Sequence, residues 1–203
     1  MNKWLVTAII ALSFGLNLAQ AAGNAEQGKT KSVVCASCHG ADGNSPLNPV
    51  WPKIAGQHPQ YIEKQIKDFK SGARNDPMMA PMAMPLSDQD VADLAAYFSG
   101  QTLQVGKAAA DKVSEGETLF RAGNPETEVA ACMACHGPSG AGNPQANFPA
   151  IGGQHAAYVE KALKDFRDAR RTNDSSNMMQ GVVNRMTDQE ITAVAQYIQG
   201  LSK

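Results

Sequence analysis

The chain has 203 residues, of which 43% are hydrophobic and 18% are charged, with 18 Lys and Arg against 19 Asp and Glu. This length suits one large domain or two small ones. The formal net charge of −1 lacks the basic excess typical of nucleic-acid-binding proteins, so we expect no nucleic-acid partner.

The first residues have the pattern of a targeting segment. Lys3 precedes an apolar run over residues 4–18, and residues 19–21 (Ala-Gln-Ala) offer a small-x-small cleavage site. The apolar run is short for a retained transmembrane anchor, and no later stretch is long and apolar enough to cross a membrane. We therefore expect residues 1–21 to be a cleaved signal peptide and the mature protein to be periplasmic.

Residues 35–39 form a Cys-x-x-Cys-His run that recurs at residues 132–136, and the two runs use all four cysteines. This run is the attachment signature of c-type haem. On one helical turn its three functional side chains share a face, so two thiolates can bond to the haem vinyl groups while the imidazole ligates the iron. The pattern predicts two covalent haem c groups per chain, at Cys35, Cys38 and His39 and at Cys132, Cys135 and His136.

Other uses of the four cysteines are less consistent with the pattern. They could form two disulfides in an oxidising compartment or hold zinc in the cytosol. Neither alternative explains why a histidine follows each pair. A thioredoxin-like redox motif needs a strand-helix-strand pattern, and the sequence has no convincing strand runs.

In chain order, each half begins with a short helix before its haem motif, around residues 28–34 and 115–122. A glycine- and proline-rich loop follows the motif, at residues 40–56 and 137–153. A middle helix comes next, with i, i+4, i+7 spacing of Ile62, Ile66 and Phe69 in one half and Val159, Leu163 and Phe166 in the other.

The last helix of each half carries one apolar stripe and clear end signals. Ser87 and Thr187 are the expected N-caps, and Glu190 completes a capping box in the second half. Gly100 and Gly200 are the expected ends. Helices thus account for all the regular structure that we expect, and neither half has enough apolar residues for a large core without a buried haem.

The two halves are a tandem duplication. An offset of 97 joins the two haem motifs, and after three extra residues the offset becomes 100. Residues 101–110 are small and polar, as a linker would be. We divide the mature chain into an N-terminal domain, residues 22–104, and a C-terminal domain, residues 105–203.

The sixth iron ligand decides what each haem can do. Of nine methionines, only the pairs at 78–79 and 178–179 are methionine in both halves. If both haems are ligated alike, the ligand lies in those pairs. Spacing alone does not choose within a pair.

Five stretches are typical of one known family: CASCHGADGN (35–44), WPKIAGQ (51–57), LSDQDVADLAAYF (86–98), FPAIGGQHAAY (148–158) and RTND (171–174). They resemble the dihaem cytochrome c4 family of bacterial periplasmic electron carriers, over essentially the whole mature chain. In that family the axial methionine lies eight residues before the Ser or Thr that opens the last helix. The resemblance therefore implies Met79 and Met179 as iron ligands.

The resemblance also implies the fold and the function. We expect an all-α protein of two tandem class I cytochrome c-like domains, each wrapped around one covalent haem, that carries single electrons and is not an enzyme. The implied partners are a quinol-oxidising cytochrome bc complex and a terminal cytochrome oxidase, and a peripheral membrane association is compatible with them. The alternative is a dihaem cytochrome c peroxidase, which needs an open iron position that histidine-methionine ligation does not leave.

Three further pairs recur in both halves. Resemblance to monohaem cytochromes c suggests that the carbonyls of Pro52 and Pro149 accept the proximal imidazole N–H, with ordinary loop prolines as the alternative. We expect a polar turn at His58 and His155, with each ring on the surface or facing a haem propionate. Arg74 and Arg171 are expected to end the middle helices, with a propionate contact as the less favoured role.

Overall fold

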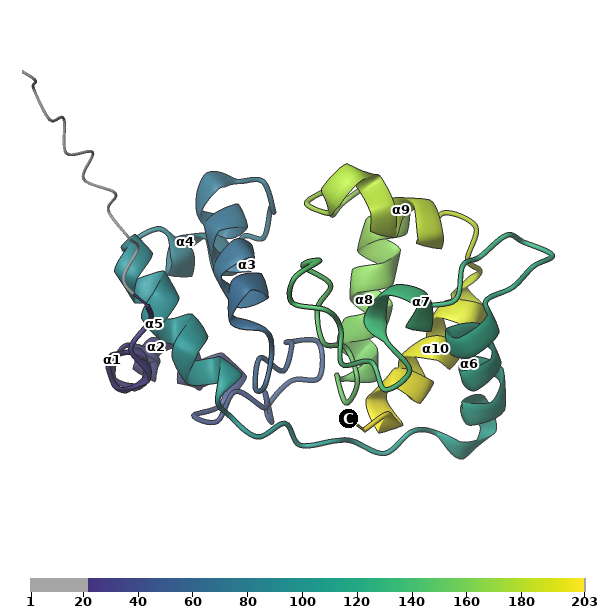
Figure 1. The fold of residues 1–203 in the computed structure, drawn as a ribbon, viewed down its shortest axis with the longest axis horizontal. Coiled ribbons are helices and arrows are strands. Elements are labelled where there is room, and N and C mark those ends of the chain that lie inside the picture. The colour runs from purple at the N-terminus through teal and green to yellow at the C-terminus, as the bar shows by residue number, and fades with distance from the viewer. Residues whose placement is uncertain (1–21, 203) are drawn as a thin grey trace, which may run out of the picture.

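The computed structural model describes residues 22–202, and the expected signal peptide lies outside the described residues. The molecule has two helical lobes joined by an extended linker (Figure 1). No helix within residues 22–202 has the length and apolarity needed to span a membrane. Between these residues, the only β-type pairings are two isolated bridges, Asn124 with Val129 and Asn143 with Phe148.

The expected helices are present in both lobes, with differences near the haem motifs. The N-terminal lobe contains α1 (Ala25–Lys31), α2 (Val33–His39), α3 (Pro59–Ser71), α4 (Met79–Ala83) and α5 (Asp88–Ser99). The C-terminal lobe contains α6 (Ala110–Ala122), α7 (Met133–His136), α8 (Ala156–Arg167), the 3₁₀ helix η1 (Ser175–Asn177), α9 (Met178–Val183) and α10 (Asp188–Gly200).

The chain before the first haem motif differs from the sequence prediction. A single helix around residues 28–34 was expected, but Ser32 ends α1 and α2 starts at the next residue, carrying the motif itself. In the second lobe α6 starts at Ala110, earlier than expected. The short helices α4 and α9 were not predicted, because five or six residues give too few turns for a periodic pattern.

The final helices α5 and α10 have the predicted N-caps. Both Ser87 and Thr187 form complete capping boxes, the first with Asp90 and the second with Glu190. The sequence prediction missed the first box because Asp is shorter than the usual Glu or Gln at that position.

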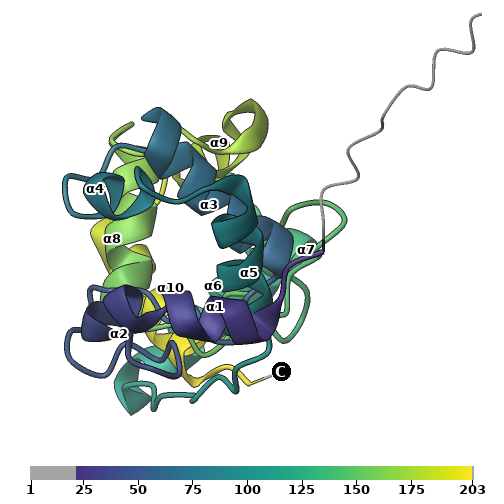
Figure 2. The same cartoon turned by 90° about the vertical axis from the view of Figure 1, so that its left-hand side faces the viewer.

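One glycine in each lobe allows the first and last long helices to cross closely. A Cβ on Gly28 of α1 would lie 2.0 Å from the Asp93 carbonyl oxygen of α5, and a Cβ on Gly116 of α6 would lie 2.2 Å from the Ala193 carbonyl oxygen of α10. Figure 2 shows α1 lying against α5 at the N-terminal end of the molecule. Only glycine permits backbones to approach so closely.

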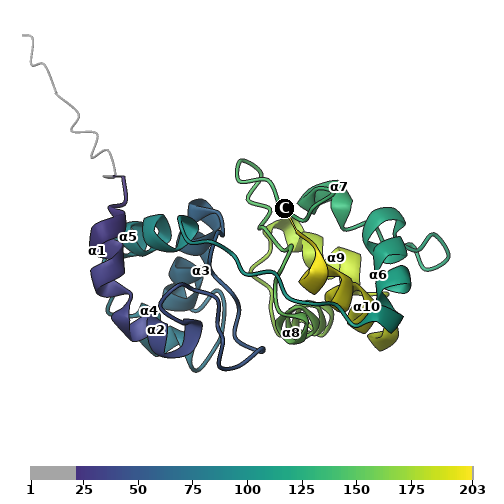
Figure 3. The same ribbon diagram turned by 90° about the horizontal axis from the view of Figure 1, so that it is seen from below.

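The apolar core is small in the N-terminal lobe and larger in the C-terminal lobe. The cluster of buried residues in contact with one another comprises Ile62, Leu94, Ala95 and Phe98 in the first lobe, whereas the cluster of the second lobe has thirteen members. The linker between α5 and α6 passes over the junction of the two lobes (Figure 3). The two lobes meet through the loops that follow the haem motifs and through side chains near them.

Candidate haem-binding sites

A single cavity of about 1300 Å³ is lined by both lobes. Its walls include both Cys-x-x-Cys-His motifs and both methionine pairs, together with apolar residues of α3, α5, α8 and α10. The cavity is therefore a shared space with one set of predicted ligands on each side.

The two motif histidines are buried and similarly held. His39 is 8% exposed and His136 is 7% exposed. Nδ1 of each ring lies 2.9 Å from a carbonyl oxygen, that of Pro52 for His39 and that of Pro149 for His136. The suggestion that these prolines supply the carbonyl acceptors is confirmed. In residues 22–202 no hydrogen bond involves Nε2 of either ring, which leaves that nitrogen free to bind iron.

Burial lowers the pKa of both His39 and His136, although the proline carbonyls act in the opposite direction. The lowered pKa favours the neutral imidazole, which is the form that ligates a metal. The carbonyl contact also fixes the orientation of each ring and increases its basicity.

The four cysteines are unpaired thiols that line the cavity. Burial raises the pKa of Cys132 to about 11 and also raises that of Cys35. Within residues 22–202 no group of three or more His, Cys, Asp or Glu side chains is arranged to hold a metal ion. The geometry thus gives no support to the disulfide or zinc alternatives.

The two methionines of each pair differ in exposure. Met78 is 53% exposed and Met178 is 42% exposed, whereas Met79 and Met179 are half-buried. Met179 packs against the core of its lobe. Since an iron ligand must be buried with the haem, the burial of Met79 and Met179 favours them over their neighbours.

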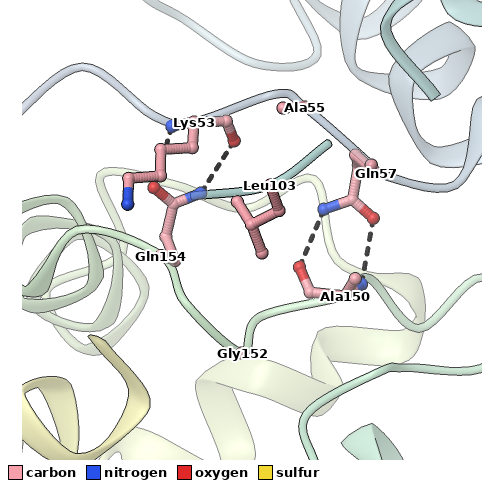
Figure 4. A pocket seen from close by; sticks show the side chains of 8 residues that line it. Lys53, Ala55, Gln57, Leu103, Ala150, Gly152 and Gln154 are labelled. Atoms are coloured by element: carbon pink, nitrogen blue, oxygen red, sulfur yellow. Dashed lines mark hydrogen bonds between the residues drawn. The ribbon is translucent and has the colours of Figure 1, made fainter. Parts of the chain in front are cut away.

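The lobes are joined by two reciprocal amide contacts (Figure 4). Gln154 accepts from Lys53 N and donates to Lys53 O, both at 2.8 Å. Gln57 accepts from Ala150 N at 2.9 Å and donates to Ala150 O at 2.8 Å. Because Gln57 and Lys53 correspond to Gln154 and Ala150 in the repeat, the lobes are related by an approximate twofold axis.

The loop histidines take part in the same interface, which corrects our expectation of a surface or propionate-facing position. His58 Nε2 lies 2.8 Å from the Ala141 carbonyl oxygen. His155 Nε2 lies 3.3 Å from the Asn44 carbonyl oxygen and 3.1 Å from that of Ser45. Each histidine therefore reaches the loop that follows the other lobe's haem motif.

The repeated arginines were expected at the ends of the middle helices, but α3 stops at Ser71 and α8 at Arg167, before either arginine. Instead, Arg74 donates to Tyr158 Oη at 3.3 Å and Arg171 donates to Tyr61 Oη at 2.9 Å, each across the interface. The sequence prediction placed both arginines at helix ends, but each helix stops before its arginine, so these contacts across the interface were not predicted.

The environment of Arg171 provides a test of whether a haem fits the cavity. The side chain lines the cavity, is 8% exposed and donates to Gln65 Oε1 as well as to Tyr61. No carboxylate of residues 22–202 pairs with Arg171 or Arg74. A buried cation requires an anionic partner, and the propionates of a haem bound in this cavity would supply one.

Gln65 is an interface residue that the sequence pattern did not indicate. Gln65 Oε1 accepts from Arg74 at 2.7 Å, from Arg171 at 3.0 Å and from Asn173 at 3.0 Å. The repeat places Ala162 opposite Gln65, so a search for repeated residues excludes it. Gln57 and Gln154 occupy equivalent positions in the repeat, but their role depends on the docking of the lobes.

The cytochrome c family model matches residues 25–101 and 113–202. Fold, cavity and paired motifs thus define a c-type cytochrome with two haem domains. Relatives named cytochrome c4 are 53% identical over 183 residues in Thiocapsa roseopersicina (89% of this chain, 94% of that protein) and 48% identical over 202 residues in Pseudomonas aeruginosa (99% and 100%). The crystal structure of reduced recombinant cytochrome c4 from Pseudomonas stutzeri matches with a TM-score of 0.86 at 47% identity, covering 89% of this chain and 100% of that one.

The chain belongs to the cytochrome c4 family. It is a dihaem electron-transfer protein with two covalently bound haem c groups, as the sequence predicted. A more distant relative is the thiosulfate dehydrogenase electron acceptor of Thiomonas intermedia, 40% identical over 173 residues, covering 83% of this chain and 78% of that protein.

Proposed function

We propose that this chain carries single electrons in the periplasm from a quinol-oxidising cytochrome bc complex to a terminal cytochrome oxidase. The observation that carries the proposal is the single cavity lined by both haem motifs. Two haems that share one cavity form a short internal path for an electron. The proposed domains are residues 22–104 and 105–203, with residues 1–21 removed on export.

The proposed roles of the site residues follow from their chemistry. Cys35 and Cys38 hold haem 1, the haem of the N-terminal lobe, and Cys132 and Cys135 hold haem 2. The proposed axial ligand pairs are His39 with Met79 and His136 with Met179. A bound haem supplies reversible one-electron chemistry at its iron, and a soft thioether ligand favours the reduced state.

The protein's own residues hold this centre in place. The carbonyls of Pro52 and Pro149 orient the proximal imidazoles. Arg171 and Arg74 offer positive charge to the propionates within the interface. Two axial protein ligands per iron leave no position for peroxide, which argues for an electron carrier over a peroxidase.

The ligand assignment is tested by replacing each methionine of the first pair. Met79→Ala should leave haem 1 attached but lower its reduction potential, because a soft sixth ligand is lost. The weak near-infrared charge-transfer band of methionine-ligated haem should fall by about half. Met78→Ala is the matched control and should change neither quantity. The opposite pattern would assign Met78 as the ligand.

The partner assignment needs a kinetic experiment. Oxidised protein is mixed with membranes that contain a cytochrome bc complex and quinol, and haem reduction is followed in a stopped-flow spectrometer. Inhibition of the complex should abolish fast reduction. Thiosulfate with a thiosulfate dehydrogenase is the second donor to test, because one relative is named as its electron acceptor. Fast reduction by this donor alone would replace the bc complex in the proposal, and consumption of added peroxide would favour the peroxidase alternative.

A further inference from the structure

The loops after the two haem motifs differ at one buried position. Ser45 is 0% exposed and has φ of +48°, and Gly142 stands at the corresponding position of the second lobe with φ of +75°. This left-handed region suits glycine, whereas a residue with a Cβ is strained there. A serine kept in such a conformation beside a functional site suggests that its hydroxyl has a role.

The hydroxyl of Ser45 contacts the group that holds the proximal histidine. Ser45 Oγ donates to the Pro52 carbonyl oxygen at 2.5 Å, and that oxygen also lies 2.9 Å from His39 Nδ1. Ser45 Oγ itself is 3.2 Å from His39 Nδ1. The Pro52 carbonyl therefore accepts from two donors.

The second lobe has a simpler arrangement. The Pro149 carbonyl oxygen lies 2.9 Å from His136 Nδ1, and Gly142 has no hydroxyl to compete for it. Within residues 22–202, the imidazole is the one side-chain donor to this oxygen. The two proximal histidines thus contact equivalent proline carbonyls, but only the carbonyl that His39 contacts accepts a second hydrogen bond from a side chain.

Backbone contacts from two sides hold Ser45 in its strained conformation. Its N–H donates to the His39 carbonyl oxygen at 2.7 Å. Its carbonyl oxygen is contacted by His155 Nε2, at 3.1 Å, from the other lobe. These contacts keep the hydroxyl aimed at Pro52.

The shorter contact of the hydroxyl sets the sign of its electronic effect, because Ser45 Oγ lies 2.5 Å from the Pro52 carbonyl oxygen but 3.2 Å from His39 Nδ1. A strong hydrogen bond from Nδ1–H to a carbonyl makes the imidazole more basic, which stabilises oxidised iron. A second donor on the same carbonyl withdraws electron density from the oxygen and weakens its bond to the imidazole. Competition at Pro52 therefore makes His39 a less basic ligand than His136.

We propose that Ser45 is a positioning residue that acts through the Pro52 carbonyl on His39 and selectively raises the reduction potential of haem 1. The repeat would otherwise give the two haems the same proximal environment. Ser45 is thus one device by which a duplicated protein makes its two haems unequal. The inference rests on the proposed assignment of His39 as the proximal ligand of haem 1.

The test compares Ser45→Ala and Ser45→Gly in the dihaem protein by potentiometric titration. Both variants lack the hydroxyl, but only Ser45→Gly relieves the backbone strain. Both should lower the potential of haem 1 by about 28 mV, which is about a threefold change in the one-electron equilibrium, and leave haem 2 unchanged. The haem 1 step is identified by NMR from the axial-methionine methyl signal that Met79→Ala removes.

A second readout follows the histidine directly. The His39 Nδ1 proton should move downfield in both variants, since its bond to Pro52 strengthens. Ser99→Ala is the matched control: this hydroxyl lies in the same lobe but donates to the Ala96 carbonyl oxygen, so neither the potential nor the proton signal should move.

Three results would overturn the inference. They are an unchanged potential in both variants, a shift confined to Ser45→Gly, which would make strain the cause, and a rise in the haem 1 potential. Failure of the underlying haem assignment is distinguishable, because the His39 ring protons would then lack the shifts that an iron-bound imidazole shows in every variant.

Discussion

The contact between Gln154 and Lys53 should stabilise the docking of the two lobes more than the equivalent contact between Gln57 and Ala150 does. Gln154→Ala removes both hydrogen bonds to the backbone of Lys53, a residue that is 7% exposed. Its N–H and carbonyl groups would then be buried without a partner, at about 1–3 kcal/mol each. We expect docking to weaken by about 2–6 kcal/mol, which is roughly a 30- to 20,000-fold change in the docking equilibrium.

The matched variant is Gln57→Ala, on the other side of the approximate twofold axis. It removes the equivalent pair of bonds to Ala150, but Gln57 and Ala150 are only half-buried. Water can replace the lost amide there, so the cost should be about 1 kcal/mol. The difference between the two variants comes from burial, because the hydrogen bonds have nearly the same lengths.

Amide hydrogen exchange of the reduced dihaem protein measures how much each variant weakens docking. In each variant the amide that is followed belongs to the other of the two contacts, which the substitution leaves intact. In Gln154→Ala the Ala150 amide should exchange much faster, since separation of the lobes exposes it. In Gln57→Ala the Lys53 amide should accelerate less. If Ala150 keeps its wild-type exchange rate in Gln154→Ala, or if both variants have equal effects, the buried contact does not control docking.

Two further predictions concern individual helices of the two lobes. Gly28→Ala should destabilise the protein by about 1–3 kcal/mol or more, because its Cβ would overlap a carbonyl oxygen of α5. Gly181→Ala in α9 has no atom within 4 Å of its Cβ and should stabilise the protein by roughly 0.5–1 kcal/mol. Denaturant unfolding that gives both variants a change in stability of the same sign would refute this reasoning. The hydrogen bond from Lys31 holds the pKa of Asp90 well below its ordinary value. The contribution of this ion pair to the stability of the folded protein is therefore complete above about pH 4 and is lost as the pH falls through the lowered pKa. Wild type should therefore exceed Asp90→Asn in stability at pH 7 and the gap should narrow at low pH, and a gap that is constant with pH would contradict the ion-pair account.

The haem motifs and the last helices could be predicted because their signals are local. A cysteine pair and a histidine on one turn, or a Ser cap followed by an apolar stripe, depend on the spacing of neighbouring residues alone. The methionine pairs were found by comparing the halves, but the choice of Met79 within its pair depended on the resemblance. The partial burial of Met79 supplies an independent reason for choosing it as the ligand, since Met78 is 53% exposed.

The interface could not be predicted by the same means. Gln57, His58 and Tyr61 each have an identical residue at the equivalent position of the second half, yet each contacts the opposite lobe, more than 80 positions away in sequence. Arg171 was expected to interact with a helix end and instead lies in the interface. Gln65 was not identified because its equivalent is an alanine.

The sequence by itself determined the cofactor, its two attachment sites, the duplication and the helical plan, because each depends on residue types at short and regular spacings. The tertiary structure decided how the two copies face one another and where they differ. The repeat predicts two similar haem sites, but the folded loop after the first motif brings the Ser45 hydroxyl onto the Pro52 carbonyl, while Gly142 stands at the equivalent position of the second lobe. The sequence records the difference between serine and glycine, but only the fold shows that the serine hydroxyl reaches the carbonyl that holds His39.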